Sequence, residues 1–564
     1  MSNSIVEQIR SSIIGARNEI EGPFGQRLVT YADYTASGRC LSFIEDFLRD
    51  HVMPYYANTH TESSGTGLQT GRFREQAREI IARTTGCTDD DVVIFCGSGA
   101  TAAINKLIDV LGLRLPQELS ERYALLEKIP EAERPVVFIG PYEHHSNELP
   151  WRESIADVVV IDEDGDGKPD QELLIAELER YKDRPLRIGS FSAASNVTGI
   201  GARTQQISSI LHEHGALAFW DFAAAAPYVN VEMNPKSDDK GDFKDAMFIS
   251  PHKFIGGPGT PGLLIVKRAL LNNSVPTQPG GGTVAYVGPT EHRYLEDPIS
   301  REEGGTPDII GAIRAGLVFQ LKEAVGDDVI RELEDTHIKS AIEQWDKNPN
   351  IRILGNPEGW RLSIVSFLIR HKKQYLHHNF VTSLLNDLFG LQVRGGCSCA
   401  GPYGHRLLDI DIVQSEAFRR EIVRGCEGIK PGWTRVNFNY FMSEEEFDYV
   451  IEAIDFVATE GWKFLPLYQF CRDSGMWKHR DWRPTGGMRL DEVRYVGGTL
   501  TYPHRHAAAQ GSCYGEYLAH ARRLLSDLEC SDIDLPEGAK ATDDFEALRW
   551  FPLPEDVCDD LRRS

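Results

Sequence analysis

The sequence contains no long apolar run and no excess of positive charge. No segment approaches the roughly 20 apolar residues that a membrane helix needs, and the start, MSNSIVEQIR, lacks the apolar core of a secretory signal. Lysine and arginine number 60 against 84 acidic residues, and the resulting net charge of −24 disfavours nucleic-acid or anionic-membrane surfaces as partners. We therefore expect a cytoplasmic protein with no nucleic-acid partner and no membrane association.

Cysteine is sparse, and no CxxC pair occurs. The ten cysteines are scattered over 564 residues, which is unlike the dense pattern of a disulfide-stabilised domain. Without CxxC, a structural zinc ribbon is not expected.

Three other segments suggest metal binding only weakly. IDEDGDGKPD (161–170) resembles the start of a calcium-binding loop, but its twelfth position is Leu173 instead of glutamate. HEH (212–214) fits the polar end of a helix, and HRH (504–506) has no partner that the sequence can identify. We expect no bound metal.

Short apolar runs alternate with helical patterns between about residues 92 and 270. Continuous runs of this kind indicate strands buried on both faces of a mostly parallel sheet, and so an α/β fold. The expected strands are 91–97, 135–140, 154–162, 186–192, 216–221, 246–250 and 262–267. Helices are expected over 101–112 and over 205–215, where Gly215 would end the second.

Changes in composition predict the domain organisation. A glycine-rich break, QPGGGT (278–283), precedes a long amphipathic helix expected from near Pro307 to about 325. A second α/β unit is expected from about 350 to 460. The residues beyond it are rich in Arg, His, Trp and Pro and contain one clear helix at 514–528. We predict four parts: 1–30, an N-terminal helical segment of the small domain; 31–325, a large domain; 326–460, a small α/β domain; and 461–564, a C-terminal module of unknown role.

Lys253 follows directly after the expected strand 246–250, within SPHKF. A lysine at the buried end of a strand is costly unless it is paired or used covalently. It is therefore either a surface lysine at a strand end or a lysine that binds pyridoxal phosphate (PLP) through a Schiff base.

Three further segments favour the second interpretation. CGSGATAAINK (96–106) would present backbone N–H groups to a phosphate at a helix start. Asp221, at the end of a strand, could keep a pyridine nitrogen protonated. His144, in EHHSN, could stack on a cofactor ring. Each signal is weak alone, but all lie at strand ends, where open α/β sheets bind their ligands.

The series of motifs resembles the class V aminotransferase family of fold type I PLP enzymes, in particular cysteine desulfurases and selenocysteine lyases. It runs from about Tyr31 to Tyr449. The matching segments are YADYTASG, GSGATAAIN, EHHSNELPW, SAASNVTG, WDFAAAAP, DAMFISPHKFIGGPGTPG, PGGGT, EEGGTPD and VRGGCSCA. The resemblance implies a large domain with a mostly parallel, seven-stranded type of sheet, a smaller α/β domain and a homodimer.

The resemblance also implies a role for each matching residue. Lys253 would bind PLP covalently and then act as acid and base, His144 would stack on the ring, and Asp221 would pair with the ring nitrogen. Asn196 would lie near the phenolic oxygen or the substrate, and Arg394 would bind the substrate carboxylate, for which a guanidinium is well shaped. The residues implied to hold phosphate are Gly99, Ala100, Thr101, Ser250 and His252, with Gly305 and Thr306 reaching the cofactor of the neighbouring subunit.

The stretch VRGGCSCAGP (393–402) carries two thiols one residue apart. Cys399 is the better match to the family's nucleophilic cysteine, which attacks the substrate sulfur and becomes a persulfide. Cys397 could be a resolving thiol, a metal-sensitive position or a small loop residue, and a disulfide between the two would be strained. The resemblance thus implies L-cysteine or a related sulfur or selenium amino acid as substrate, alanine as product and a possible sulfur-acceptor protein as partner.

Two features depart from the simplest match. Ala224 stands where many family members have a glutamine that donates to the cofactor's phenolic oxygen. Several motifs also resemble the desulfurase domain of molybdenum cofactor sulfurases. The residues after about 460 are too few for the large sulfur-receiving domain of those proteins, so we do not expect complete sulfurase activity.

Two alternatives remain open: a class V lyase, epimerase or aminotransferase that forms no persulfide, and a non-catalytic scaffold that has lost PLP. We predict that the purified protein is yellow, because a lysine-bound PLP absorbs visible light. The absorption spectrum checks this, and a colourless protein that takes up no added PLP would favour the scaffold.

Overall fold

A seven-stranded sheet forms the centre of the larger of the chain's two compact units. Its strands are β4 (Asp91–Cys96), β5 (Val136–Ile139), β6 (Asp157–Val160), β7 (Arg187–Ser192), β8 (Leu217–Asp221), β9 (Ala246–Ile249) and β10 (Gly262–Lys267). They lie in the order β4-β10-β9-β8-β7-β5-β6. From β9 to β6 the pairs are parallel, whereas β10 is antiparallel to both neighbours. All seven expected strands are confirmed. Six of them are largely buried, as a sheet covered on both faces requires, whereas the edge strand β6 is partly exposed.

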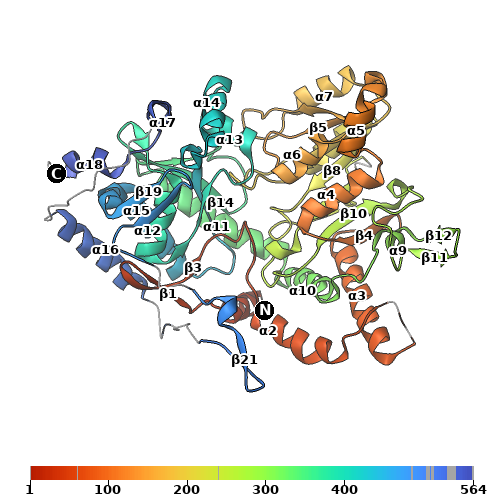
Figure 1. Cartoon of the computed structure of the whole chain (residues 1–564), viewed down its shortest axis with the longest axis horizontal. Coiled ribbons are helices and arrows are strands. Elements are labelled where there is room, and N and C mark those ends of the chain that lie inside the picture. The colour runs from red at the N-terminus through yellow and green to blue at the C-terminus, as the bar shows by residue number, and fades with distance from the viewer. Residues whose placement is uncertain are drawn as a thin grey trace. The chain divides into compact units, whose positions relative to one another are not determined.

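This arrangement comes from a computed structural model, shown in Figure 1. It describes residues 2–59, 61, 63–238, 241–483, 487–503, 509, 513–529 and 542–561. The chain divides into two units. The first unit is Met1–Ile14, Tyr34–Asp335 and Glu358–Leu362, and the second is Gly15–Asp33, Thr336–Pro357 and Ser363–Ser564.

Helices of the first unit pack against its sheet. Helix α4 (Gly99–Val110) packs on β10 and β9 through an apolar face that includes Ile104 and Leu107. Helix α8 (Thr204–Glu213) ends before Gly215, whose φ of +67° is readily adopted by glycine, as expected. The other elements are α1 (Ser2–Ser12), α2 (Ser42–Phe47), α3 (Gly65–Thr84), α5 (Gln117–Tyr123), α6 (His145–Arg152), α7 (Gln171–Arg180), β11 (Val284–Val287), β12 (His292–Tyr294), α9 (Pro298–Glu302) and α10 (Ile309–Val325).

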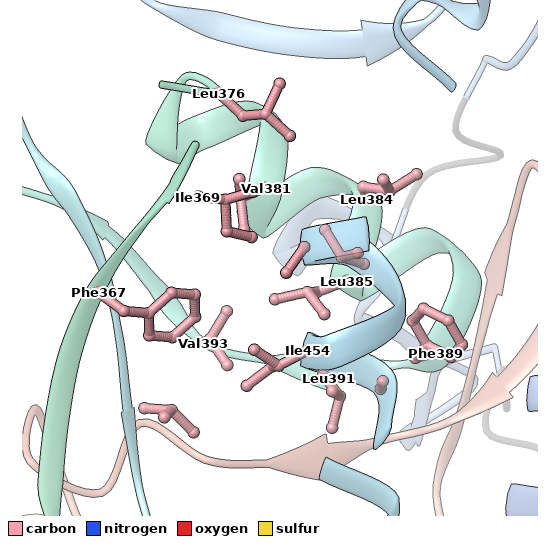
Figure 2. Packing of buried hydrophobic residues seen from close by; sticks show 14 of the residues in the cluster. Phe367, Ile369, Leu376, Val381, Leu384, Leu385, Phe389, Leu391, Val393 and Ile454 are labelled. Atoms are coloured by element: carbon pink, nitrogen blue, oxygen red, sulfur yellow. The ribbon is translucent and has the colours of Figure 1, made fainter. Parts of the chain in front are cut away.

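The second unit is built on an antiparallel sheet. Its strands β13 (Ile351–Ile353), β14 (Ile364–His371), β18 (Trp433–Asn437) and β17 (Arg394–Gly396) lie in that order, and β15 (Gln374–Tyr375) pairs with β14. Helices α12 (His378–Phe389) and α15 (Glu444–Glu460) pack against each other in this unit. Figure 2 shows part of the shared core, with Phe367, Ile369, Val381, Leu384, Leu385, Phe389 and Ile454 among its side chains.

Smaller elements complete the chain. In the second unit they are β1 (Glu19–Gly22), β2 (Gly25–Leu28), β3 (Thr30–Tyr31), β16 (Leu391–Gln392), α13 (Gly401–Leu407), α14 (Ile412–Val423), β19 (Tyr468–Cys471), β20 (Met476–His479), β21 (Arg494–Val496), β22 (Thr499–Thr501), α16 (Tyr514–Glu529), α17 (Asp543–Leu548) and α18 (Pro554–Leu561). Helix α11 (Asp327–Trp345) runs across the boundary between the units. Of the helices in the described ranges, none has the length and apolarity needed to cross a bilayer.

The two units divide the ends of the chain differently from the predicted domains. Helix α1 packs on α10, so residues 1–14 join the first unit. The residues after 460 join the second unit, because Tyr468, Trp477 and Phe551 are buried in the same core as α12. The C-terminal part is therefore integrated into a shared core, and it includes the expected helix at 514–528, observed as α16.

We predict that Leu385→Ala destabilises the second unit by about 2–5 kcal/mol, because its buried side chain (0% exposed) would leave a cavity. Ile412→Ala removes an aliphatic side chain that is 80% exposed, and its effect should stay within about 0.5 kcal/mol. Urea unfolding followed by tryptophan fluorescence compares the two variants. Equal losses of stability would contradict the assignment of Leu385 to the core.

Candidate functional site

Lys253 lies in a tight turn directly after β9. The turn is a single 3-10 segment, Pro251–Lys253, in which the Lys253 N–H donates to the Ser250 carbonyl at 3.0 Å. The backbone of Gly38 comes so close that a Cβ built there would lie 1.9 Å from the Phe254 oxygen. The Gly38 N–H donates to the His252 carbonyl at 2.8 Å. The turn that carries the half-buried Lys253 is thus held by close backbone contacts with Gly38, which leave no room for a side chain at position 38.

Asp221 ends β8, the strand next to β9, and is only 5% exposed. One carboxylate oxygen accepts a hydrogen bond from the Ala223 N–H at 2.8 Å. Burial raises the pKa of Asp221, while the charge of Lys253 acts in the opposite direction. A cation close to this carboxylate would therefore favour its ionised form.

The start of α4 meets the turn of Lys253. The Ala100 N–H donates to the Ser250 hydroxyl at 2.8 Å. A Cβ built on Gly99, whose φ is +57°, would lie 2.9 Å from that hydroxyl and 3.7 Å from Nε2 of His252. Burial, followed by the charge of Lys253, lowers the pKa of His252 to about 4, so this imidazole is neutral at pH 7.

A chain of hydroxyl contacts joins α4 to α6. Thr101 Oγ1 lies 2.7 Å from Ser146 Oγ, which lies 3.0 Å from His144 Nδ1. His144 caps α6, because the Ser146 N–H donates to Nδ1 at 3.1 Å. The sequence analysis did not single out Ser146, although its place two residues after the cap histidine in EHHSN was a usable signal.

Glu143, beside His144, is a second residue that the sequence analysis missed. Its buried carboxylate accepts four hydrogen bonds: from Gly140 N (3.2 Å), Ser192 N (2.8 Å), Ser192 Oγ (2.6 Å) and Asn147 Nδ2 (2.6 Å). Burial is the main influence on this carboxyl and raises its pKa to about 7, with a smaller contribution from Asp221. Glu143 thereby ties the turn before α6 to β7 and fixes the position of His144.

Asn196 and Ala224 follow the ends of β7 and β8, respectively. Asn196 is buried in a turn closed by the Ser195 N–H, which donates to the Ile200 carbonyl at 2.9 Å. Ala224 is also buried and carries no polar side-chain atom, so it cannot make the hydrogen bond of the glutamine found here in many members of the family that the sequence resembles.

Gly305 and Thr306 lie beside the glycine-rich segment 278–283. The Gly305 N–H donates to the Gly281 carbonyl at 2.8 Å, and the Thr306 hydroxyl accepts from Asn58 Nδ2 at 3.3 Å. These contacts are separate from those around Lys253.

The two thiols of 393–402 belong to the second unit, on a loop that follows β17. Cys397 and Cys399 are free and exposed, and Arg394 is also exposed. Ser398 and Cys399 have φ values of +51° and +56°, the left-handed region that side chains disfavour. Two consecutive non-glycine residues in this region mark local backbone strain, which is concentrated at functional sites in proteins.

The two glycines before these thiols, Gly395 and Gly396, are needed for different reasons: close packing at the first and backbone conformation at the second. A Cβ built on Gly395 would lie 2.8 Å from Asn379 Oδ1 and 2.9 Å from Thr382 Oγ1, so β17 lies directly on the first turn of α12. Gly396 has a φ of +120°, which only glycine adopts readily.

The segments considered for metal binding have other partners. Arg203 forms ion pairs with Asp164 at 2.9 Å and with Asp166 at 3.1 Å, so two carboxylates of the acidic turn are already neutralised by a guanidinium. His212 lies 2.9 Å from Asp245. The described ranges contain no group of three or more His, Cys, Asp or Glu side chains arranged for a metal ion. HRH (504–506) lies outside the described residues.

The groups around Lys253 fit PLP. The start of a twelve-residue helix, a serine hydroxyl and a neutral imidazole form a donor set suited to a phosphate. The nearby Asp221 is a buried carboxylate suited to a protonated pyridine nitrogen, and Lys253 is a primary amine that can bind an aldehyde. A Cβ on Gly99 would crowd the Ser250 hydroxyl, so glycine at this position lets the start of α4 lie close to Ser250 and His252.

We predict that Glu143 makes the first unit less stable as the pH rises from about 4.5 to about 7. In this window the native carboxyl keeps a proton that the unfolded chain releases, so the free energy of unfolding falls with rising pH. The stability difference between wild type and Glu143→Gln should therefore shrink by about 1 to 3 kcal/mol across the window. Urea unfolding at several pH values measures it, with the exposed Glu153→Gln as control. Parallel pH profiles of wild type and Glu143→Gln would contradict the prediction.

Comparison with known proteins identifies the family and the fold of this chain. The sequence profile described as "Aminotransferase class-V" matches residues 30–450, and this family depends on PLP. A probable cysteine desulfurase of Halalkalibacterium halodurans is 27% identical over 396 residues, which cover 69% of this chain and 88% of that protein. A probable cysteine desulfurase of Staphylococcus aureus is 28% identical over 383 residues, covering 67% and 84%.

Solved structures show the same fold. The apo structure of a cysteine desulfurase from Thermococcus onnurineus superposes with a TM-score of 0.61 at 23% identity, covering 76% of this chain and 95% of that one. An Escherichia coli cysteine desulfurase in an S-sulfonic acid form gives 0.60 at 20% identity, covering 81% and 98%. The resemblance inferred from the motifs, the α/β fold of type I and the dependence on PLP are confirmed, and the chain belongs to the class V aminotransferase family.

Proposed function

We propose that the protein is a PLP-dependent cysteine desulfurase that cleaves the C–S bond of L-cysteine or a related sulfur or selenium amino acid. The observation that carries the proposal is that Asp221 and Lys253 lie at the ends of the adjacent strands β8 and β9, while the start of α4 contacts the turn of Lys253. The names of the curated relatives support cysteine as the substrate.

Each group in the first unit has a definite task in this proposal. Ser250, His252, Thr101 and the N–H groups of Gly99 and Ala100 hold the phosphate, and Asp221 holds the ring nitrogen. His144, aimed by its contact with Ser146, covers the ring, and Asn196 lies near the phenolic oxygen or the substrate. PLP, when bound, supplies an electron sink that stabilises negative charge on the substrate carbon atoms.

The chain's own groups handle substrate binding and protons. The guanidinium of Arg394 binds the substrate carboxylate, for which its planar donors are suited. The amine of Lys253 removes the proton from Cα of the substrate and returns protons to carbon. Asp221 stays ionised beside a positive partner, since such a charge opposes the effect of burial on its pKa.

Cys399 carries the sulfur step. Its thiolate attacks the sulfur of the substrate, and an S–S bond forms while the Cβ–S bond breaks. The electron pair of the broken bond stays on Cβ, which takes up a proton, so the amino acid leaves as alanine. The products balance without an external oxidant, because cysteine and an enzyme thiol give alanine and an enzyme persulfide.

The same proposal covers the roles of the two domains, the second subunit, the location of the protein and the sulfur acceptor. The large domain 31–325 would bind PLP, the small domain 326–460 would carry Cys399, and Gly305 and Thr306 would reach the cofactor of the other subunit in a homodimer. A cytoplasmic location and a thiol-containing acceptor protein for the persulfide fit the acidic composition and the chemistry.

We predict that Cys399→Ala lowers alanine and sulfide production from L-cysteine at least about a hundredfold, because the covalent sulfur acceptor is lost. Cys397→Ala is the matched control, since it removes a neighbouring exposed thiol, and it should keep most of the activity. Alanine and sulfide are measured with dithiothreitol present.

Unchanged sulfide release by Cys399→Ala would exclude a Cys399 persulfide and favour a class V lyase that eliminates sulfur directly. Loss of activity in Cys397→Ala alone would move the nucleophile to that residue.

A further inference from the structure

An aromatic residue near the C-terminus stacks on two buried histidines of the second unit. The ring of Trp550 lies 5.3 Å from that of His377, with planes 19° apart, and 5.8 Å from that of His378, with planes 11° apart. The two imidazoles are themselves stacked, with centroids 4.3 Å apart. Three aromatic rings thus form one compact group, which we call the Trp550–histidine stack.

Trp550 is held firmly in place. Its indole N–H donates to the Ile429 carbonyl at 3.1 Å, and its own carbonyl accepts from the Tyr375 N–H at 3.2 Å. The next residue, Phe551, is fully buried and meets the His377 ring edge-on at 4.6 Å. Residues 549–551 therefore add to the unit's core and to its backbone hydrogen bonding, rather than lying loosely on its surface.

His377 connects the stack to the start of α12. Its Nδ1 accepts from the Asn379 N–H at 3.1 Å, which caps the helix, and its Nε2–H donates to the Gly428 carbonyl at 3.1 Å. These two bonds fix the tautomer and the plane of the ring. The pKa of His377 is lowered well below its usual value by burial, so the ring remains neutral.

His378 connects the stack to the cysteine loop. A Cβ built on Gly432 would lie 2.8 Å from Cε1 and Nδ1 of His378 and 2.9 Å from the carbonyl carbon of Gly396. The imidazole and the residue before Cys397 are therefore separated by a single glycine. Nδ1 of His378 has no hydrogen-bond partner among the described residues, so the ring is positioned by packing and stacking.

The other side of the loop stem rests on the same helix turn. Gly395 lies against the His378 carbonyl, which a Cβ there would approach to 3.1 Å, and against Asn379. The Asn379 amide donates in turn to the Gly475 carbonyl at 2.9 Å, in the hairpin β19–β20. The stem of the loop that carries the strained Ser398–Cys399 backbone therefore packs on the cap of α12. C-terminal residues contact the same cap.

We propose that Trp550 is a positioning residue for sulfur transfer: through His377 and His378 it holds the stem of the Cys397–Cys399 loop, so that the C-terminal module orders the nucleophile. The inference rests on the proposed desulfurase function for its catalytic consequence. Its structural part concerns only the second unit and can be measured separately.

The test is hydrogen–deuterium exchange of PLP-loaded, full-length Trp550→Ala, read at the peptide covering residues 394–402. Loss of the aromatic stack should speed exchange there about three- to tenfold. Trp550→Phe, which keeps a ring, should restore most of the protection. The kcat for alanine formation should fall by a similar factor in Trp550→Ala, with a smaller change in KM.

Phe545→Ala is the matched control. Phe545 is a buried aromatic residue of the same C-terminal module that contacts the rings of Phe470 and Phe551, so it lies one ring further from His377 than Phe551 does. This variant should lose stability and exchange faster within 542–548, but it should leave 394–402 as protected as in wild type. If Trp550→Ala does not fold, Trp550→Leu, which keeps an apolar side chain but no ring, replaces it.

Wild-type exchange at 394–402 in the Trp550 variant would overturn the proposal, as would equal acceleration at 394–402 in Phe545→Ala. If wild type forms no alanine from cysteine, the proposed function fails, but the exchange comparison still decides whether Trp550 orders the loop.

Discussion

The backbone contact between Gly262 and Gly99 is the constraint on which the site of the first unit depends. The Gly262 N–H donates to the Gly97 carbonyl at 3.0 Å, and a Cβ on Gly262 would lie 1.9 Å from the Gly99 oxygen. This approach lets β10 enter the sheet between β4 and β9, directly beside the start of α4. The turn that carries Ser250 and Lys253 thereby lies against the start of α4, where the Ala100 N–H donates to the Ser250 hydroxyl.

Much of this arrangement could be predicted from the sequence. The seven strands were recognisable because each is a short apolar run, and all but the edge strand β6 are largely buried; the ends of these strands marked Asp221 and Lys253. The antiparallel direction of β10 was not predictable from its composition, since a buried strand has the same apolar pattern in either direction. Glu143 and Ser146 were missed because their importance lies in hydrogen bonds to segments distant in the sequence.

The second unit shows a different limit of sequence analysis. The stretch VRGGCSCAGP indicated a thiol loop, but not that Ser398 and Cys399 adopt left-handed conformations or that Gly395 touches α12. The residues after 460 suggested a separate module because their composition changes. Their buried aromatic side chains instead complete the core around α12, which only long-range packing could reveal.

The position of β10 also has a consequence for the life of the protein in a cell. A cofactor bound at the start of α4 and at Lys253 would connect the end of the edge strand β4 with the end of β9, across β10, so it would resist separation of these three strands. Stability then rises with the ratio of free cofactor to its dissociation constant. Molecules that lack the cofactor would open more often and would therefore be more accessible to proteases.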